Sequence, residues 1–463
     1  MKNISLNLFN FLMISGFILV TSLSASVNVA IIDSGVDIEH KDFTDSIWIN
    51  QDEVAGNWRD DDGNLYPDDI YGWNFAENNP FVIDRKYIGT FSNDPYKFFD
   101  IQGKLFFDKA TQEEKDWLAA KRKDKKFAKE MGKFGNFVHG THVAGIGLGA
   151  SEDINIQAIK LIPTEVKPFI KELSRQVKLH NYVEERGDDW RKKLMTQFFN
   201  MMAEQQAGLM GQIALYLKHE DIQIANGSFG SGYRQLSKVL TDVIYRVLHF
   251  KKPTKEQSEA TAKILLEAMV REMRIVFAQA DQTFFVFAAG NDGLDNDYLP
   301  TSPASINLEN SIAVAATYND LCIAPFSNFG AKSVDIAAPG MIIKSQIPGN
   351  EYLRVSGTSQ AAPYVAHVAA SVQLENAELM PKQIKQILMG TVDYKEFLKG
   401  KVLSEGLVNK ERAQLAAKMS LEMPLEEAIS LARKEVKDQK MKSEFTCQAA
   451  DKVEPLALFP NFR

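Results

Sequence analysis

Short, uninterrupted runs of Val, Ile and Ala are the feature that most restricts the fold of this chain. They predict six strands, at residues 28–33, 154–162, 222–226, 284–288, 311–316 and 334–337. Helical stretches separate most of these runs, and strands that are apolar on both faces are typical of a parallel sheet covered by helices on both sides. We therefore expect an α/β fold whose functional side chains lie at the carboxyl ends of its strands.

Three short stretches carry residue types that suit nucleophilic catalysis. A strand that ends in Asp33 is followed by a sharp turn (IIDSG), and His139 is expected to open a helix of small residues (HGTHVAG). Ser359 is expected to begin another helix (GTSQAAP), with Pro363 in the first turn, where backbone amides lack partners anyway. A serine hydroxyl needs a nearby base, and that base needs an orienting group, so the three residue types together predict acyl transfer.

An oxyanion site is the second requirement of this chemistry. The first amides of a helix carry partial positive charge, and Asn291, in FAAGNDG after an apolar strand, is placed to add a side-chain donor. Taken singly, a strand-end aspartate usually serves a turn, and serine or asparagine often caps a helix or turn. Their joint occurrence favours catalysis. His142, in contrast, is expected to be packed and hydrogen-bonded.

In the order Asp, His, Asn, Ser, these stretches resemble those of the subtilisin-like serine proteases (subtilases, peptidase S8 family). The resemblance covers about residues 27–417 and continues through NFG at 328–330, DIAAPG at 335–340 and GLVN at 406–409. It implies a three-layer α/β/α subtilisin-like fold with a mainly parallel central sheet. It also implies a serine endopeptidase that works through an acyl-enzyme intermediate.

The resemblance also implies a role for each matching residue. Ser359 would be the nucleophile, His139 the general base and acid, and Asp33 the group that orients His139. Asn291 and the backbone amide of Ser359 would form the oxyanion hole. The substrate-binding edges and pocket walls would be formed by Ser228, Phe229, Gly230, Ala288, Ala289 and Gly290. Their small, uncharged character predicts an apolar P1 preference.

An acidic loop (NWRDDDGN, 57–64) between the aspartate and histidine motifs is a candidate metal site. Its oxygen ligands would be Asp60, Asp62, Asn64 and Asp68. Alternating oxygen ligands suit a hard cation such as calcium, although Leu65 and Tyr71 stand where an EF-hand has glycine and glutamate. A solvated acidic turn is the alternative. Zinc is not expected, because the His139 and His142 pair lacks the glutamate of helical metalloproteases, and the chemistry itself requires no cofactor.

The N-terminus resembles a secretory signal peptide. An apolar run from Leu6 to Leu23 leads to small residues, which places cleavage near Ser24 to Ser26 and the mature protein outside the cytoplasm, secreted or periplasmic. An uncleaved membrane anchor is the alternative. Because the first predicted strand follows almost at once, no N-terminal propeptide is expected. Folding and control would then rest on the helical insertions, the C-terminal tail, or a separate inhibitor or chaperone.

The remaining sequence indicates the domain boundaries and the class of partner. A peptidase domain is expected at 26–417, with helical insertions at about 76–136, 163–219 and 231–280, and a charged helix and tail at 418–463. We expect the inserted helices to border the cleft. The 60 acidic and 53 basic residues give a net charge of −7, which argues against a nucleic-acid partner. The family resemblance implies a peptide or protein substrate.

Two positions depart from the family pattern: Gln360 stands where the family usually has methionine, and His367 where it usually has a small residue. The alternative to an enzyme is a catalytically silent peptide-binding module. An esterase is disfavoured, because GTSQA lacks the second glycine of a nucleophile elbow. With two cysteines, Cys322 and Cys447, a four-cysteine zinc site is excluded, and the sequence leaves their pairing open.

Overall fold

The structure is a computed structural model that describes residues 26–151, 153–165, 188–234, 238–249, 251–439 and 454–455. The predicted signal peptide and part of the second insertion lie outside the described residues. Cys322 is disulfide-bonded, and Cys447 also lies outside the described residues. No helix in the described ranges is both long and apolar enough to cross a membrane.

A nine-stranded sheet forms the centre of the described chain, in the order β10-β11-β7-β5-β4-β3-β1-β2, with β6 beside β5. The strands are β1 (Val27–Asp33), β2 (Ile154–Lys160), β3 (Ile224–Gly227), β4 (Phe284–Ala288), β5 (Ser311–Tyr318), β6 (Cys322–Ile323), β7 (Ile336–Pro339), β10 (Asp393–Tyr394) and β11 (Gly406–Leu407). Neighbours are parallel except for the β5–β6 and β10–β11 pairs. All six predicted runs form strands of this sheet.

The rest of the described chain forms helices, a hairpin, turns and loops. The helices are α1 (Asn93–Phe106), α2 (Gln112–Lys121), α3 (Lys125–Leu148), α5 (Asp188–His219), α6 (Lys238–His249), α7 (Lys255–Phe277), α8 (Thr358–Glu375), α9 (Pro381–Gly390), α10 (Lys410–Met419) and α11 (Leu425–Glu435). Short 3₁₀ turns lie at Arg85–Tyr87, Ala304–Ile306 and Glu396–Leu398. A separate antiparallel hairpin, β8 (Ile343–Ile347) with β9 (Glu351–Val355), was not predicted.

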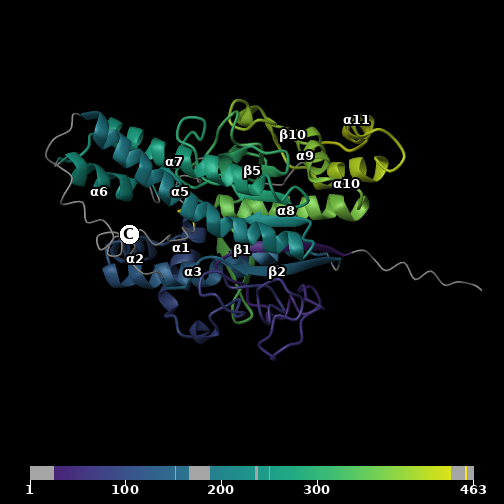
Figure 1. The fold of residues 1–463 in the computed structure, drawn as a ribbon, viewed down its shortest axis with the longest axis horizontal. Coiled ribbons are helices and arrows are strands. Elements are labelled where there is room, and N and C mark those ends of the chain that lie inside the picture. The colour runs from purple at the N-terminus through teal and green to yellow at the C-terminus, as the bar shows by residue number, and fades with distance from the viewer. Residues whose placement is uncertain are drawn as a thin grey trace, which may run out of the picture.

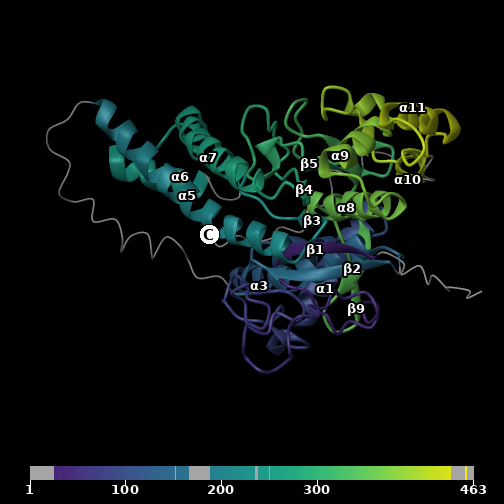
Figure 2. The same ribbon diagram turned by 45° about the vertical axis from the view of Figure 1, so that its right-hand side comes forward.

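Two helical layers cover the sheet (Figure 1 and Figure 2). Successive side chains of a strand point to opposite faces. Val29 and Ile31 of β1 pack into the apolar cluster that contains residues of α3 and α8, whereas Ala30 and Ile32 pack into the cluster with residues of α5 and α7. This arrangement confirms the three-layer α/β/α fold with a mainly parallel sheet.

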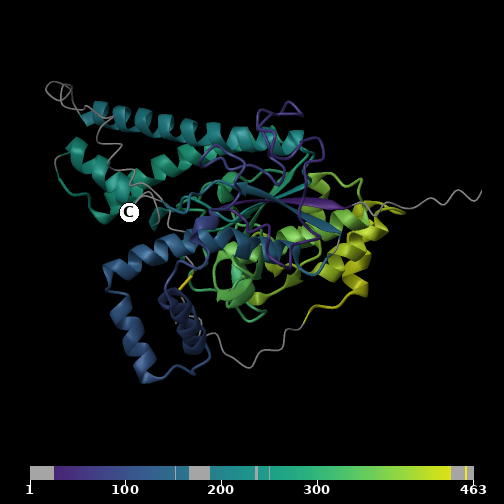
Figure 3. The ribbon, with the colours of Figure 1, turned by 90° about the horizontal axis from the view of Figure 1, so that it is seen from below.

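The insertions form two helical extensions of this core. The α1–α3 segment encloses an aromatic cluster that includes Phe99 and Phe134. Helix α5 is long, packs along α7 and reaches beyond the sheet (Figure 3). The prediction that His139 opens its helix is wrong. Asp124 accepts the backbone N–H groups of Lys126 and Phe127, so α3 starts at Lys125, within the first insertion, and His139 lies well inside the helix.

Candidate active site

Asp33 and His139 form a buried pair at the carboxyl end of β1. Oδ1 of Asp33 lies 2.7 Å from Nδ1 of His139 and also accepts the backbone N–H of Ser34 at 2.7 Å. Because an ionised carboxylate only accepts hydrogen bonds, Nδ1 carries the proton and Nε2 presents a lone pair. Among the described residues Nε2 has no hydrogen-bond partner. The imidazole is therefore arranged as a base.

A close backbone approach brings this pair together. A Cβ placed on Gly140 would lie 2.2 Å from the carbonyl oxygen of Gly35, so only glycine lets α3 rest on the turn that follows β1. The hydroxyl of Ser34 accepts the Gly140 N–H at 3.1 Å. Contact between a helix and a strand-end turn thus sets the position of His139 relative to Asp33.

Ser359 is the second residue of α8, as predicted, and it exchanges hydrogen bonds with Ser228. Its Oγ donates to the Ser228 carbonyl at 3.1 Å, while Ser228 Oγ donates to the Ser359 carbonyl at 3.0 Å. Pro363 lies in the second turn, not the first as predicted. Since proline lacks an N–H, it leaves the Ser359 carbonyl without its helical donor, and Ser228 supplies the replacement.

The structure places the nucleophile candidate and the base candidate on neighbouring helices. α3 and α8 pack against each other and against β1. The described hydrogen bonds do not include one between Ser359 and His139: the serine hydroxyl is directed at the Ser228 carbonyl. In enzymes without substrate, catalytic hydrogen bonds are often long or unformed, and rotation of one serine side chain is enough to change this partner.

Asn291 follows β4 and is oriented by Thr358. The Asn291 side-chain oxygen accepts both the backbone N–H of Thr358 at 2.9 Å and its hydroxyl at 3.0 Å. This fixes the amide so that its NH₂ group is left to donate elsewhere. Thr358 was not singled out in the sequence, although its place directly before Ser359 was the available signal. Gly290, at φ +111°, leaves room for Asn328, whose Nδ2 would lie 2.6 Å from an added Cβ.

A cavity of about 230 Å³ adjoins Ser359 and Asn291. Five of the six predicted wall residues line it, namely Ser228, Phe229, Gly230, Ala288 and Gly290. Ala289 does not line the cavity, because its side chain packs into an apolar cluster with Ala315 and Ala337.

One wall of the cavity comes from an insertion. Gln206, Leu209 and Met210 of α5 line it opposite the strand ends, so α5 borders the cleft as expected. Asp292 also lines the cavity; burial raises the pKa of its carboxyl, which accepts the backbone N–H of Arg234 at 3.0 Å. The cavity is mainly apolar with one buried acid in its lining.

Two further polar residues near the site are buried. His142 is packed as expected: its Nε2 lies 3.1 Å from the carbonyl of Leu353, and burial lowers its pKa to about 3, so it stays neutral. Gln360 is fully buried directly after Ser359, and both polar atoms of its amide lack partners among the described residues. Next to the nucleophile candidate, the family's usual methionine is thus replaced by an unpaired amide.

The acidic loop divides into two parts. Asp60 and Asp68 shape the loop itself: Asp68 accepts the N–H groups of Gly56 at 2.7 Å and Trp58 at 2.6 Å. Asp60 accepts those of three residues, Gly63, Asn64 and Leu65. Backbone donors therefore occupy these two predicted ligands.

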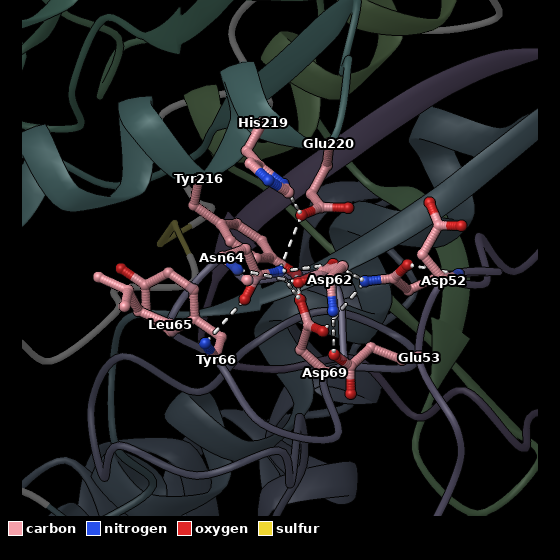
Figure 4. Close-up of polar contacts among 12 residues, drawn as sticks. Asp52, Glu53, Asp62, Asn64, Leu65, Tyr66, Asp69, Tyr216, His219 and Glu220 are labelled. Carbon is pink, nitrogen blue, oxygen red and sulfur yellow. Dashed lines mark hydrogen bonds and ion pairs between the residues drawn. The ribbon is translucent and has the colours of Figure 1, made fainter. Parts of the chain in front are cut away.

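The other part is a carboxylate cluster around Asn64 (Figure 4). Asn64 Nδ2 lies 3.1 Å from Asp62, 3.0 Å from Asp69 and 2.9 Å from Glu220, which directly follows α5. Tyr216 donates its hydroxyl to Asp69, and burial raises the pKa of Asp69 to about 7. The prediction that Asn64 offers an oxygen ligand is wrong in this structure: its Nδ2 faces the acids, and its Oδ1 accepts the N–H of Tyr66 at 2.7 Å. Among these acids, Glu220 is distant in sequence.

Asp62 belongs to two groups of side chains that are close enough together to share one ion. Its carboxylate groups with His219 and Glu220, and separately with Glu53 and Asp60, with ligand atoms within 4.8 Å of one another in each group. The donors are mainly carboxylate oxygens, which fit a hard cation. Glu53, His219 and Glu220 were not predicted; His219 and Glu220 are far from the loop in sequence, so no local pattern indicates their approach.

Comparison with known proteins identifies the family. The Subtilase family profile (Peptidase_S8) matches residues 24–416. Subtilisin-like protease 1 of Plasmodium falciparum (isolate 3D7) is 24% identical over 400 residues, which cover 84% of this chain and 43% of the relative. Alkaline elastase YaB of Bacillus sp. (strain YaB) is 37% identical over 142 residues, 31% of this chain and 35% of the relative. These matches span less than half the length of either relative.

Two solved structures are similar at low identity. A cold adapted subtilisin-like serine proteinase aligns with a TM-score of 0.42 and 20% identity, covering 83% of this chain and 88% of that one. A lanthipeptide protease aligns with a TM-score of 0.45 and 19% identity, covering 85% and 88%. The family profile extends over most of the sequence, from the strand that ends in Asp33 to beyond the helix that carries Ser359. The chain belongs to the Subtilase family.

Proposed function

We propose that this protein is a serine endopeptidase that uses Asp33, His139 and Ser359 as its catalytic triad. The observation that carries the proposal is the buried 2.7 Å contact between Asp33 and His139, which leaves Nε2 without a partner among the described residues. The helix that bears His139 packs against the helix that bears Ser359. Family membership supports the reaction class. Each residue type suits one step of acyl transfer.

In the first step, Ser359 Oγ attacks the carbonyl carbon of the peptide bond as His139 Nε2 takes its proton. His139 then gives this proton to the leaving amine, which leaves an acyl-enzyme that water hydrolyses by the reverse sequence. Asp33 accepts the Nδ1 hydrogen throughout, so it holds the imidazole in the tautomer that exposes the Nε2 lone pair. The serine must first leave its hydrogen bond to Ser228.

Negative charge that develops on the substrate oxygen needs donors. Asn291 is suited to this role because Thr358 ties down its carbonyl oxygen and leaves its NH₂ group free to donate. The Ser359 backbone amide, near the start of α8, is the second donor, and it gains from the partial positive charge of the helix N-terminus.

The cavity supports an apolar P1 preference. Its lining is small or apolar on the strand side, and Leu209 and Met210 extend this character onto α5. Substrate would bind in an extended conformation beside Ser228 and Gly230, as peptides do at open strand edges. Because α5 adds a wall on the other side, we infer that flexible or unfolded segments are cleaved in preference to folded ones.

A catalytically silent peptide-binding module is the second candidate. One observation favours it: the Ser359 hydroxyl bonds to Ser228 instead of His139. Such a module would bind peptides in the same cavity and hydrolyse none.

Hydrolysis of an unfolded protein substrate separates the two candidates. The native chain is expected to cleave it, and Ser359→Ala to lose this activity. Ser371→Ala is the matched control, since Ser371 is a buried serine of the same helix whose hydroxyl donates to the backbone carbonyl of His367 at 2.8 Å. Full activity in Ser359→Ala would refute the triad, and binding without cleavage by the native chain would support the silent module. Equal cleavage of folded and unfolded substrates would refute the role of α5.

We also propose a structural calcium ion at the carboxylate cluster. Asp62 and Glu220 would hold it together with His219, and its charge would relieve the repulsion between the two half-buried acids. No step of catalysis involves this ion. Calcium is expected to raise the melting temperature of the native chain and not that of Glu220→Gln. Equal shifts in both proteins, or none in the native chain, would remove the site.

Export completes the proposal. The apolar run at residues 6–23, with the small residues that follow it, supports a secreted or periplasmic protein. Mass spectrometry of protein recovered from outside the cytoplasm is expected to find an N-terminus near Ser24 to Ser26. An intact Met1 in the exported protein would contradict cleavage.

A further inference from the structure

A fully buried lysine lies next to Asp33. The parallel pairing of β1 with β2 sets Lys160 opposite Asp33 in register. Paired residues of a parallel ladder point to the same face. Here it is the face covered by α3 and α8, because Ile31 and Ala158, two positions earlier on each strand, pack into the cluster of that side. The lysine therefore belongs to the surroundings of the proposed Asp33–His139 pair.

Two acids from the first insertion hold the Lys160 ammonium. Its Nζ lies 2.6 Å from Oε2 of Glu77 and 3.1 Å from Oδ2 of Asp84. A buried ammonium group is stable only when it is paired and hydrogen-bonded. The three groups together carry a net charge of −1, and removal of any one of them changes the charge beside β1 by a full unit.

The segment that supplies these acids also contacts the turn after Asp33. The carbonyl of Val82 accepts the N–H of Val36 at 3.1 Å, and an added Cβ on Gly35 would lie 2.4 Å from the same carbonyl oxygen. Arg85 pairs with Asp37 at 3.4 Å. One inserted segment thus touches the strand end on both sides, through the turn and through Lys160.

We propose that the charges of Lys160, Glu77 and Asp84, held beside the end of β1, tune the base strength of His139 through its partner Asp33. This inference rests on the proposed triad. It assigns to the first insertion a role in tuning the active site, which minimal strand-to-helix connections would not provide.

Other ionisable groups lie on α3, on the turn after β1 and on the elements packed against α3. They are His142 on the same helix, the Asp37–Arg85 pair after the turn, His367 of α8 at the far end of α3, and Lys344 of β8. The variants Lys160→Met and Asp84→Asn change none of these groups.

The test is the pH dependence of fluorophosphonate labelling, which reports the fraction of His139 that is neutral and needs no known substrate. Lys160→Met removes a positive charge and is expected to raise the apparent pKa of the acid limb by about 0.5–1 unit. Asp84→Asn removes a negative charge and is expected to lower this pKa by about 0.3–0.5 unit. Shifts of opposite sign are not expected from loss of structure alone.

Lys104→Met is the matched control, since Lys104 pairs with Asp100 and Glu114 in the same insertion but at its surface. It should shift nothing. Unchanged pH dependence in both test variants, or shifts of the same sign, would overturn the inference. If Lys160→Met does not fold, Asp84→Asn decides alone: a lowered pKa supports the inference and an unchanged one overturns it. Failure of the native chain to label at all would instead refute the proposed triad.

Discussion

The carboxyl edge of the sheet and the acidic loop differ in how fully their polar side chains are hydrogen-bonded. At the sheet edge, Asp33 Oδ2, His139 Nε2 and both amide atoms of Gln360 have no partner among the described residues. In the loop, Asp60 and Asp68 accept backbone hydrogen bonds with both oxygens. An unpaired buried polar atom costs about 1–3 kcal/mol. Such a cost is tolerated where a group must be available to react, whereas the paired carboxylates stabilise the backbone conformation of the loop.

The largest expected effect contrasts one aspartate from each region. Asp33→Asn should lower kcat on the order of 10⁴-fold, because an amide stabilises the wrong tautomer of His139. Asp68→Asn, in the loop, should leave kcat of the folded protein unchanged. Steady-state kinetics on a peptide substrate measures both. A small loss in Asp33→Asn, or an equal loss in the two variants, would remove the distinction between the regions.

The next effect concerns the oxyanion donor. Asn291→Ala should lower kcat by about 10²–10³-fold with little change in KM, because the lost hydrogen bond forms mainly in the transition state. The same kinetics measures it. A change confined to KM would mean that Asn291 binds substrate and does not stabilise the oxyanion.

Substitutions in the acidic loop should lower the stability of the protein and leave its catalytic rate unchanged. Asp68→Ala removes the acceptor of the Gly56 and Trp58 N–H groups and should lower the free energy of unfolding by about 2–3 kcal/mol. Urea unfolding measures this loss, with kcat per folded molecule as the control. An unchanged free energy of unfolding would show that these bonds do not support the loop.

A pH-dependent effect is expected at His367. Burial, together with the nearby Lys410 ammonium, lowers its pKa to about 4 from its ordinary value near 6.5. The unfolded chain therefore binds the proton first, so stability is complete above about pH 6.5 and falls as the pH drops towards 4, by about 2.5 kcal/mol at pH 4.5. His367→Met should lose less over this range in urea unfolding. Parallel pH profiles for the two proteins would contradict the assignment.

The smallest effect tests the unpaired amide. Gln360→Met replaces two buried polar atoms without partners by an apolar chain of similar size, and should raise the free energy of unfolding by about 1 kcal/mol. Thermal or urea unfolding measures the gain. A loss of stability would indicate that the amide has a partner, such as a buried water.

The sequence predicts the strands of the sheet well because an apolar run is a local signal. It predicts Ser359 near a helix start because the GTSQAAP motif is also local. It does not predict contacts between distant segments. Glu220 joins Asn64 from 156 residues away, and the Ser228 hydroxyl replaces the hydrogen bond that Pro363 removes from α8. The start of α3 was missed because the Asp124 cap lies outside the small-residue motif that contains His139.

The most direct test of the central claim is the site of covalent modification by a fluorophosphonate, mapped by mass spectrometry on the intact native chain. The account predicts one adduct per molecule, on Ser359, formed at a rate that falls by orders of magnitude in His139→Ala. An adduct on another residue, or labelling that is independent of His139, would contradict the proposed triad.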